Sequence, residues 1–90
     1  MYRLEYTNKF KKDYKLALKR GCKESLIQKV IVSIAKKELL PAKHHPHKLT
    51  GNYIDCWECH IQPDWLLIWR INEETDTLTL VATGTHSDLF

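Results

Sequence analysis

The spacing of apolar residues divides the N-terminal half of this chain into its expected elements. Tyr2, Leu4 and Tyr6 alternate with charged residues, which is typical of a short strand. Apolar residues then recur three and four positions apart, which predicts two helices, one ending at Gly21 and one over residues 23–38. Their apolar stripes are Phe10, Tyr14, Ala17 and Leu18, and then Ile27, Val30, Ile31, Ile34 and Ala35. The short connection between them predicts an antiparallel pair.

The second half of the chain has the alternating, β-branched and aromatic pattern of strands. Strands are expected at residues 53–60, 65–71 and 77–83, because a short run of turn-forming polar residues separates each from the next. Residues 41–52 contain two prolines, a glycine and three histidines, and are expected to form a loop.

Two tight hairpins predict which side chains face each other across these strands. With a short loop between the first two strands, His60 is expected opposite Trp65. Pairing Ile71 with Leu78 in the second hairpin then places Trp65 opposite Gly84. The side chains expected to meet at one end of the sheet are His60, Asp64, Trp65 and His86.

The order of the elements, β-α-α-β-β-β, predicts the fold class. Residues 1–90 are expected to form a single domain, at a size where folding does not usually require disulfides or metals. The order favours an α+β fold in which a helical hairpin packs on one face of a mainly antiparallel four-stranded sheet. The other face of the sheet is expected to remain partly open.

Charge is distributed unevenly between the two halves of the chain. Residues 1–48 hold 13 Lys or Arg and four acids, a net charge of +9, whereas residues 49–90 hold one Arg and seven acids, a net charge of −6. The basic half suits a polyanion such as RNA, or an acidic protein partner. Lysine-rich helix faces are also often merely solvated, so charge alone does not decide between these interpretations.

Hydropathy and cysteine content predict a cytoplasmic location. No apolar run approaches the roughly 20 residues of a membrane span, and the N-terminal pattern is that of a strand rather than of an export signal. Three cysteines are an odd number, whereas a secreted domain held by disulfides usually carries an even set. The cysteines are therefore expected to be free thiols.

Cys56, Cys59 and His60 form the string CxxCH, which matches the haem-attachment motif. Haem attachment requires export and usually a helical motif, whereas this string is predicted to lie in a strand, with its cysteines on opposite faces. Zinc is a second alternative, since Cys22 and five histidines are also available, but no second CxxC or HxxxH completes a site. We therefore expect neither a metal nor a cofactor.

Three histidines and an aspartate, at His47, His60, Asp64 and His86, favour metal-free proton transfer. Cleavage of RNA through its own 2′-hydroxyl requires a base, an acid and positive charge near the phosphate. Imidazole can serve in both proton roles because its pKa lies near neutrality. A single histidine is more often only a surface residue, and His47 depends on the loop returning beside the strand.

Aromatic residues are the candidates for stacking on RNA bases. Aromatic residues in strands more often belong to the core, so Trp57 and Trp69 are expected mainly to pack. Trp65, at the hairpin, and Phe90, at the end of the sequence, are the predicted base contacts.

Three ordered blocks, HKLTG at residues 47–51, ECHIQPDWLLI at 58–68 and TGTHSDLF at 83–90, resemble the signature segments of the YafQ branch of the RelE/ParE superfamily of bacterial toxins. The resemblance extends over essentially the whole chain. It implies a RelE-like toxin of a type II toxin-antitoxin pair that enters the ribosomal A site, contacts mRNA and rRNA there, and cuts the mRNA without a metal. The products would be a 2′,3′-cyclic phosphate, or its opened 3′-phosphate, and a 5′-hydroxyl.

The resemblance also implies roles for individual residues. The catalytic positions of the family fall on His47, His60, Asp64 and His86, and its aromatic positions fall on Trp65 and Phe90. A cognate antitoxin is the implied protein partner, expected to cover the basic half with acidic residues. No membrane partner is expected.

One position departs from the family pattern. Many relatives have an arginine four residues before the terminal histidine, where it can neutralise the scissile phosphate, but this chain has Ala82. Losing such a cation would slow the chemistry by roughly 100- to 1000-fold, by analogy with an oxyanion donor. The candidate substitutes are Arg70, Lys43 and Lys48, with Lys48 preferred because it adjoins His47.

Two alternative functions follow from these observations. The chain could be a catalytically weakened homologue that survives as an antitoxin-binding protein, because of Ala82. It could instead poison gyrase, like ParE toxins of the same superfamily, although such a toxin has no use for clustered histidines. Which histidine is the acid and which the base is not decided by the sequence.

Overall fold

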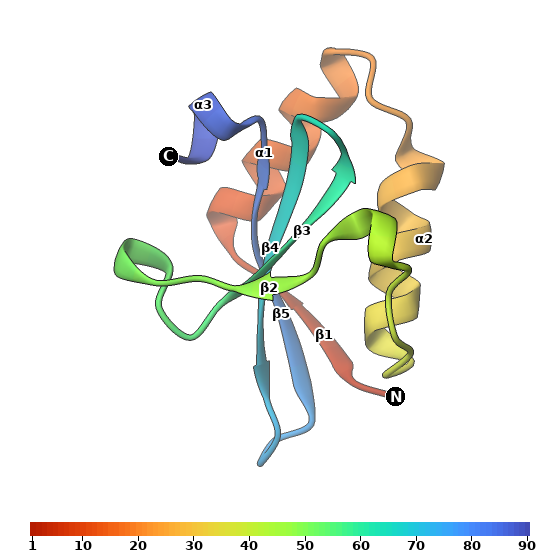
Figure 1. The fold of residues 1–90 in the computed structure, drawn as a ribbon, viewed down its shortest axis with the longest axis vertical. Helices are drawn as coiled ribbons and strands as arrows, with labels where there is room; N and C mark the ends of the chain where they lie inside the picture. Colours follow the sequence, from red (N-terminus) through yellow and green to blue (C-terminus); the bar gives the residue numbers. More distant parts are fainter.

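The computed structural model of the chain describes residues 1–90 and contains a five-stranded sheet and three α-helices (Figure 1). The elements, with two short 3₁₀ helices labelled η, are β1 (Arg3–Tyr6), α1 (Asn8–Lys19), α2 (Glu24–Ala35), η1 (Ala42–His44), β2 (His47–Lys48), η2 (Gly51–Tyr53), β3 (Trp57–Gln62), β4 (Trp65–Asn72), β5 (Thr77–Gly84) and α3 (His86–Leu89). The strand order is β1-β5-β4-β3-β2, with β1 parallel to β5 and the other neighbours antiparallel. The predicted α+β fold is confirmed, with one more strand than expected and an additional one-turn helix.

Local capping defines the two long helices. The Thr7 side-chain oxygen accepts a hydrogen bond from the backbone N–H of Phe10 at 2.9 Å, which begins α1. The second helix ends at Ala35, three residues earlier than predicted, because Lys37 adopts a left-handed conformation with φ of 62°. No helix combines the length and apolar character needed to span a membrane.

The segment expected to be a loop contains regular structure that places His47 beside the sheet. After η1, the two residues of β2 pair with β3, His47 opposite Glu58 and Lys48 opposite Trp57. Strand β3 begins at Trp57 rather than at residue 53, because η2 turns the chain just before it. The two-residue strand therefore fixes the position of His47, which the sequence left open.

The register of the first hairpin is one residue away from the prediction. His60 pairs with Leu66 rather than with Trp65, because the pairing shifts by a bulge between His60 and Gln62. In the second hairpin, Ile71 pairs with Leu78 as predicted, but a second bulge beyond Trp69 brings Leu66, not Trp65, opposite Gly84. Since side chains alternate between the faces of a strand, this shift turns Trp65 to the opposite face from His60.

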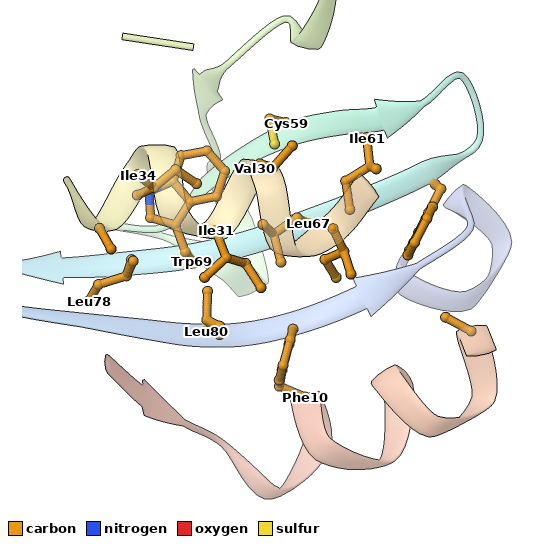
Figure 2. Packing of buried hydrophobic residues seen from close by; sticks show 14 of the residues in the cluster. Phe10, Val30, Ile31, Ile34, Cys59, Ile61, Leu67, Trp69, Leu78 and Leu80 are labelled. Atoms are coloured by element: carbon orange, nitrogen blue, oxygen red, sulfur yellow. The ribbon is translucent and has the colours of Figure 1, made fainter. Parts of the chain in front are cut away.

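The main core lies between the sheet and the two long helices (Figure 2). α1 packs mainly on β5 and α2 on β3. The residues of this core include Phe10, Ile27, Val30, Ile31, Ile34, Cys59, Ile61, Leu67, Trp69, Leu78 and Leu80. Covering this face leaves the opposite face of the sheet available for a site.

A smaller apolar cluster lies on the open face of the sheet. Its buried members are Cys56, Leu66, Ile68, Ala82 and Leu89, with Leu49 and Tyr53 packed against them. The predicted separation of the two strand cysteines is confirmed, since Cys56 belongs to this cluster and Cys59 to the main core. Their sulfurs face opposite sides of the sheet, so they cannot bind one haem or zinc ion together. Burial also raises the pKa of the Cys59 thiol to about 12.

Candidate active site

Four side chains predicted to be catalytic gather at one end of the open sheet face. His47 lies on that face with His60, because His47 pairs with Glu58, which is two residues before His60 in β3. His86 begins α3, directly after β5, and Asp64 lies in the turn between β3 and β4. The two hairpins thus bring these residues together, and their catalytic roles stay predictions.

Asp64 holds His86 through two hydrogen bonds. Its Oδ1 accepts from the backbone N–H of His86 at 2.9 Å and from the ring Nδ1 at 2.7 Å. These bonds, the backbone one first, lower the pKa of the Asp64 carboxyl from its ordinary 3.8. Because a carboxylate can only accept, the Nδ1 of His86 carries a hydrogen. The Nε2 of His86 is then the ring nitrogen available for proton transfer.

Glu58 is a buried acid between His47 and His60 that the sequence analysis did not select. The Glu58 side chain is only 6% exposed, and its Oε1 lies 3.3 Å from His47 Nε2 and 3.8 Å from His60 Nε2. Its other oxygen, Oε2, is buried without a hydrogen-bond partner. The available signal was its spacing of two residues from His60, which places both side chains on one face of a strand.

A hydrogen bond to the backbone fixes the orientation of the His47 ring. The ring Nδ1 of His47 donates to the backbone carbonyl of His45 at 2.8 Å, because a carbonyl can only accept. Nδ1 therefore carries a hydrogen. The other ring nitrogen, Nε2, lies 3.3 Å from Oε1 of the buried Glu58 carboxyl. The Glu58 carboxyl therefore lies between the rings of His47 and His60.

The ring of His60 lies between other imidazoles. Its centroid is 5.5 Å from that of His86 and 5.9 Å from that of His45, both in edge-to-face arrangements. His44 fixes the strand behind it, because its Nδ1 donates to the His60 carbonyl at 2.7 Å. We call the resulting contact series the histidine row, and its members are His47, Glu58, His60, His86 and Asp64.

The candidate cations lie in two regions, Lys43 in one hollow and both Lys48 and Arg70 along another. Lys43 lines the same hollow as His45 and His60. Lys48 faces away from the histidine row, because it pairs with Trp57 and its Nζ lies 5.8 Å from the centre of that ring. This position corrects the expectation that Lys48 lies beside the phosphate, since neighbours in a strand point to opposite faces.

Arg70 and Ala82 also have defined environments. Arg70 pairs with Thr79, as predicted, and lines a hollow with Glu73 and Glu74 near the β4–β5 turn, away from the histidine row. Ala82 is fully buried opposite Ile68 in the smaller cluster. An arginine at this position would have to displace apolar side chains of that cluster, so its absence is part of the local packing.

The tryptophans belong to the helix-covered face. Trp65 is 3% exposed, and its Nε1 donates to the Thr83 hydroxyl at 3.0 Å. This burial corrects the expectation that Trp65 stacks on a base, and its cause is the register shift of the first hairpin. Trp57 stacks on Trp69 at 6.5 Å between ring centroids, which confirms their predicted packing role.

Phe90 is the aromatic side chain that stays available next to the histidine row. It is 63% exposed, and the edge-to-face contact of its ring with Tyr53 has a centroid distance of 5.6 Å. Phe90 follows α3, the helix that carries His86. The prediction that Phe90 contacts a base is therefore compatible with its position.

Known proteins resemble this chain over nearly its whole length. A family model described as a bacterial toxin of type II toxin-antitoxin system, YafQ, matches residues 2–90. The mRNA interferase toxin YafQ of Escherichia coli is 33% identical over 88 residues, which cover 97% of this chain and 94% of that protein.

Solved structures match over essentially the whole chain. A metal-bound toxin from Helicobacter pylori superposes with a TM-score of 0.94 at 40% identity, covering 100% of both chains. YafQ in the E. coli DinJ-YafQ complex superposes with a TM-score of 0.89 at 32% identity, covering 100% of this chain and 99% of that one. In this chain, no group of three or more His, Cys, Asp or Glu is arranged to hold a metal ion. With the family model matched almost from end to end, the chain belongs to the YafQ family of bacterial toxins of type II toxin-antitoxin systems.

Proposed function

We propose that the chain is an mRNA interferase, which cuts mRNA in the ribosomal A site through attack of a ribose 2′-hydroxyl on the adjacent phosphate. The observation that carries this proposal is the histidine row, in which proton-transfer groups contact one another along an open face. The name of the E. coli relatives, mRNA interferase toxin, supports the same activity.

The proposed reaction needs two proton transfers. A base removes the 2′-hydroxyl proton while O2′ forms a bond to phosphorus, and an acid protonates the departing 5′-oxygen as its bond to phosphorus breaks. His60 and His86 carry these transfers, and Asp64 keeps the His86 ring in one orientation and tautomer. The Glu58 carboxylate, 3.8 Å from His60 Nε2, stabilises the positive charge that this ring gains when it takes up a proton. The products are a 2′,3′-cyclic phosphate and a 5′-hydroxyl, so protons and bonds balance without a metal.

The proposed partners are the ribosome with its mRNA and a cognate antitoxin. The DinJ-YafQ complex supports an antitoxin partner for a relative of the same fold. The net charge of +9 on residues 1–48 suits either rRNA or an acidic antitoxin segment. We expect the protein to bind both partners in the cytoplasm.

The test of this proposal is cleavage of a defined mRNA on programmed ribosomes, compared with the same mRNA free in solution. The expected result is cleavage only on ribosomes, with a 5′-hydroxyl at the new end, and unchanged activity after extensive treatment of the toxin with a chelator. Loss of activity on chelation, restored by adding a divalent metal, would contradict the metal-free mechanism. A metal-dependent mechanism is the specific alternative that this control tests, because the structure of the H. pylori relative was solved with metal bound.

The same assay separates the alternative functions. Gyrase poisoning predicts intact mRNA but altered DNA supercoiling in a matched reaction. A weakened homologue, which the buried Ala82 in place of the family's arginine favours, predicts tight antitoxin binding without cleavage. Either result would overturn the proposed activity.

Lys43, rather than Lys48, is proposed as the cation nearest the scissile phosphate. Replacing Lys43 with Gln is expected to lower the cleavage rate by about tenfold or more, because a cation near a developing negative charge stabilises the transition state. Lys48→Gln is the matched control, since it removes the same charge on the opposite sheet face. Equal losses in single-turnover assays of the two variants would show that only overall charge matters.

A further inference from the structure

Helix α3 carries His86, but few of its own side chains anchor the helix to the rest of the protein. It spans only His86–Leu89, and Leu89 is its one buried side chain. The link from Asp64 to His86 starts from an exposed turn. A single turn of helix is unstable in isolation, so its orientation depends on contacts with the rest of the molecule.

An ion pair from the far end of α1 supplies such a contact. The Nη1 of Arg20 lies 2.6 Å from Asp88 Oδ2, and its Nη2 lies 3.4 Å from Oδ1. Such a two-point contact of a guanidinium with a carboxylate restricts orientation as well as distance. Arg20 and Asp88 are 68 residues apart in the sequence, so this contact joins the end of α1 to the C-terminal helix α3.

Asp88 connects the Arg20 ion pair to the backbone of Thr85, the residue that precedes His86. Its Oδ2 also accepts from the backbone N–H of Thr85 at 3.0 Å, and its own N–H donates to the Thr85 hydroxyl at 3.1 Å, which makes a complete capping box. The carboxylate lies directly over Gly84, where an added Cβ would approach Oδ2 to 2.9 Å. Gly84 also has a φ of +157°, which residues with a side chain rarely adopt. Glycine at this position therefore leaves free the space that the Asp88 carboxylate occupies.

We propose that Arg20 is a positioning residue for His86, acting through Asp88 to fix the short helix on which the imidazole sits. This inference rests on the proposed function only for its effect on catalysis, because the ion pair and the capping box are features of the fold. His86 is then held from two sides, by Asp64 at its ring and by Arg20 through the helix. A ring fixed at both points keeps its distance to His60, and loosening one of them lowers the fraction of productive encounters.

The electrostatics of Asp88 agree with this arrangement. The hydrogen bond from Arg20 first, and that from the Thr85 backbone second, lower the pKa of the Asp88 carboxyl from its ordinary 3.8 to about 2. The other titratable groups that line the hollow beside it are Asp13, Cys22 and Asp64. A carboxyl whose pKa is lower in the folded state than in the unfolded state stabilises the folded state at pH values above its ordinary pKa. This stabilisation is lost as the pH falls toward 2. The helix is therefore expected to stay anchored at neutral pH and to loosen in strong acid.

The test compares Arg20→Gln with Arg20→Lys and with Lys19→Gln. Lys19→Gln is the matched control, because it removes one positive charge from the neighbouring position in the last turn of α1. Hydrogen exchange of the α3 amides and an NMR titration of Asp88 report on the anchor whether or not the protein cleaves RNA. Single-turnover and steady-state cleavage on programmed ribosomes separate kcat from KM.

In Arg20→Gln, exchange of the Leu89 and Phe90 amides is expected to rise about threefold or more, the size of one partly exposed ion pair. The pKa of Asp88 is expected to rise toward its ordinary value, and kcat to fall by about tenfold at unchanged KM. Arg20→Lys should recover part of each effect, and Lys19→Gln should show none of them.

Two outcomes would overturn the inference. Unchanged exchange and an unchanged Asp88 titration in Arg20→Gln would show that the anchor does not exist in solution. A raised KM at unchanged kcat, shared with Lys19→Gln, would show that Arg20 is only one charge of a basic RNA-binding face. An inactive wild-type protein would contradict the proposed function, whereas the exchange and titration results would still decide whether Arg20 anchors the helix.

Discussion

Replacing His86 with Gln should lower the rate of mRNA cleavage by roughly 100- to 10,000-fold, the usual range for loss of a positioned acid or base. Among the three histidines, His86 has the most restricted orientation, because Asp64 accepts hydrogen bonds from both its backbone N–H and its ring Nδ1. Glutamine keeps a polar side chain at this exposed position but cannot exchange protons near neutral pH. The fold should therefore be retained, with a stability change within about 0.5 kcal/mol, as is usual for surface substitutions.

Single-turnover cleavage on programmed ribosomes and thermal unfolding measure these two effects. Ser87→Gln is the matched control, because Ser87 is also exposed in the one turn of α3 and lies next to His86 in the sequence. His60→Gln should show a loss similar to that of His86→Gln, and the double variant should lose less than the product of both, since residues that act as a unit are not additive. Full activity in both single variants would remove these histidines from the mechanism.

Replacing Glu58 with Met should make the protein more stable and less active. The carboxyl of Glu58 is buried with Oε2 unpartnered, and a charge or polar group left in this state costs free energy. Methionine has a similar size and flexible shape, so it can fill the space without polar atoms. Because the His47 side chain is 49% exposed and stays in contact with water when its partner is removed, loss of the unpartnered oxygen outweighs loss of the ion pair, and we expect a gain of about 1–3 kcal/mol in the free energy of unfolding. Cleavage should fall by about 100-fold, because the carboxylate that stabilises a protonated His60 in the proposed mechanism is lost.

Thermal unfolding gives a clear measure of the first effect, because about 1 kcal/mol shifts the midpoint by roughly 4–8 °C in a domain of this size. Glu74→Met is the control, since Glu74 is exposed in the β4–β5 turn and should affect neither stability nor rate appreciably. Glu58→Gln keeps the shape of the side chain but not its negative charge, and should be as slow as Glu58→Met. A less stable Glu58→Met variant, or one that cleaves at the normal rate, would show that Glu58 is only a structural partner of its neighbours.

Patterns between residues close in the sequence determined much of this protein. The helix stripes, the two hairpins and the charge asymmetry each depend on residues a few positions apart, and together they predicted the α+β fold and the gathering of His60, Asp64 and His86 at one sheet end. The second register, Ile71 with Leu78, was also predictable because a tight turn specifies its own pairing. The three signature blocks were sufficient to predict the family.

The tertiary structure decided what depends on single-residue shifts and on distant segments. Two bulges shifted the strand pairing by one residue. This shift reversed the sheet face to which Trp65 points and so placed its side chain in the core. The two-residue strand β2 turned Lys48 away from the histidine row and brought His47 to Glu58. Turn-forming residues predict that a hairpin exists, but a bulge depends on the packing of both sheet faces, which no local pattern reports.

The contact of Arg20 with Asp88 is the strongest example of this limit. Read locally, Arg20 is one of many cations near the end of a basic helix, and Asp88 is a cap of a short C-terminal helix. Only the packing of α1 against β5 brings them together, across 68 residues of the chain. The sequence by itself thus determined the elements, the fold and most of the chemistry, because these follow from periodicity and residue type. Which side chains touch was decided by the folded chain, because contacts between distant segments depend on the sum of all the packing between them.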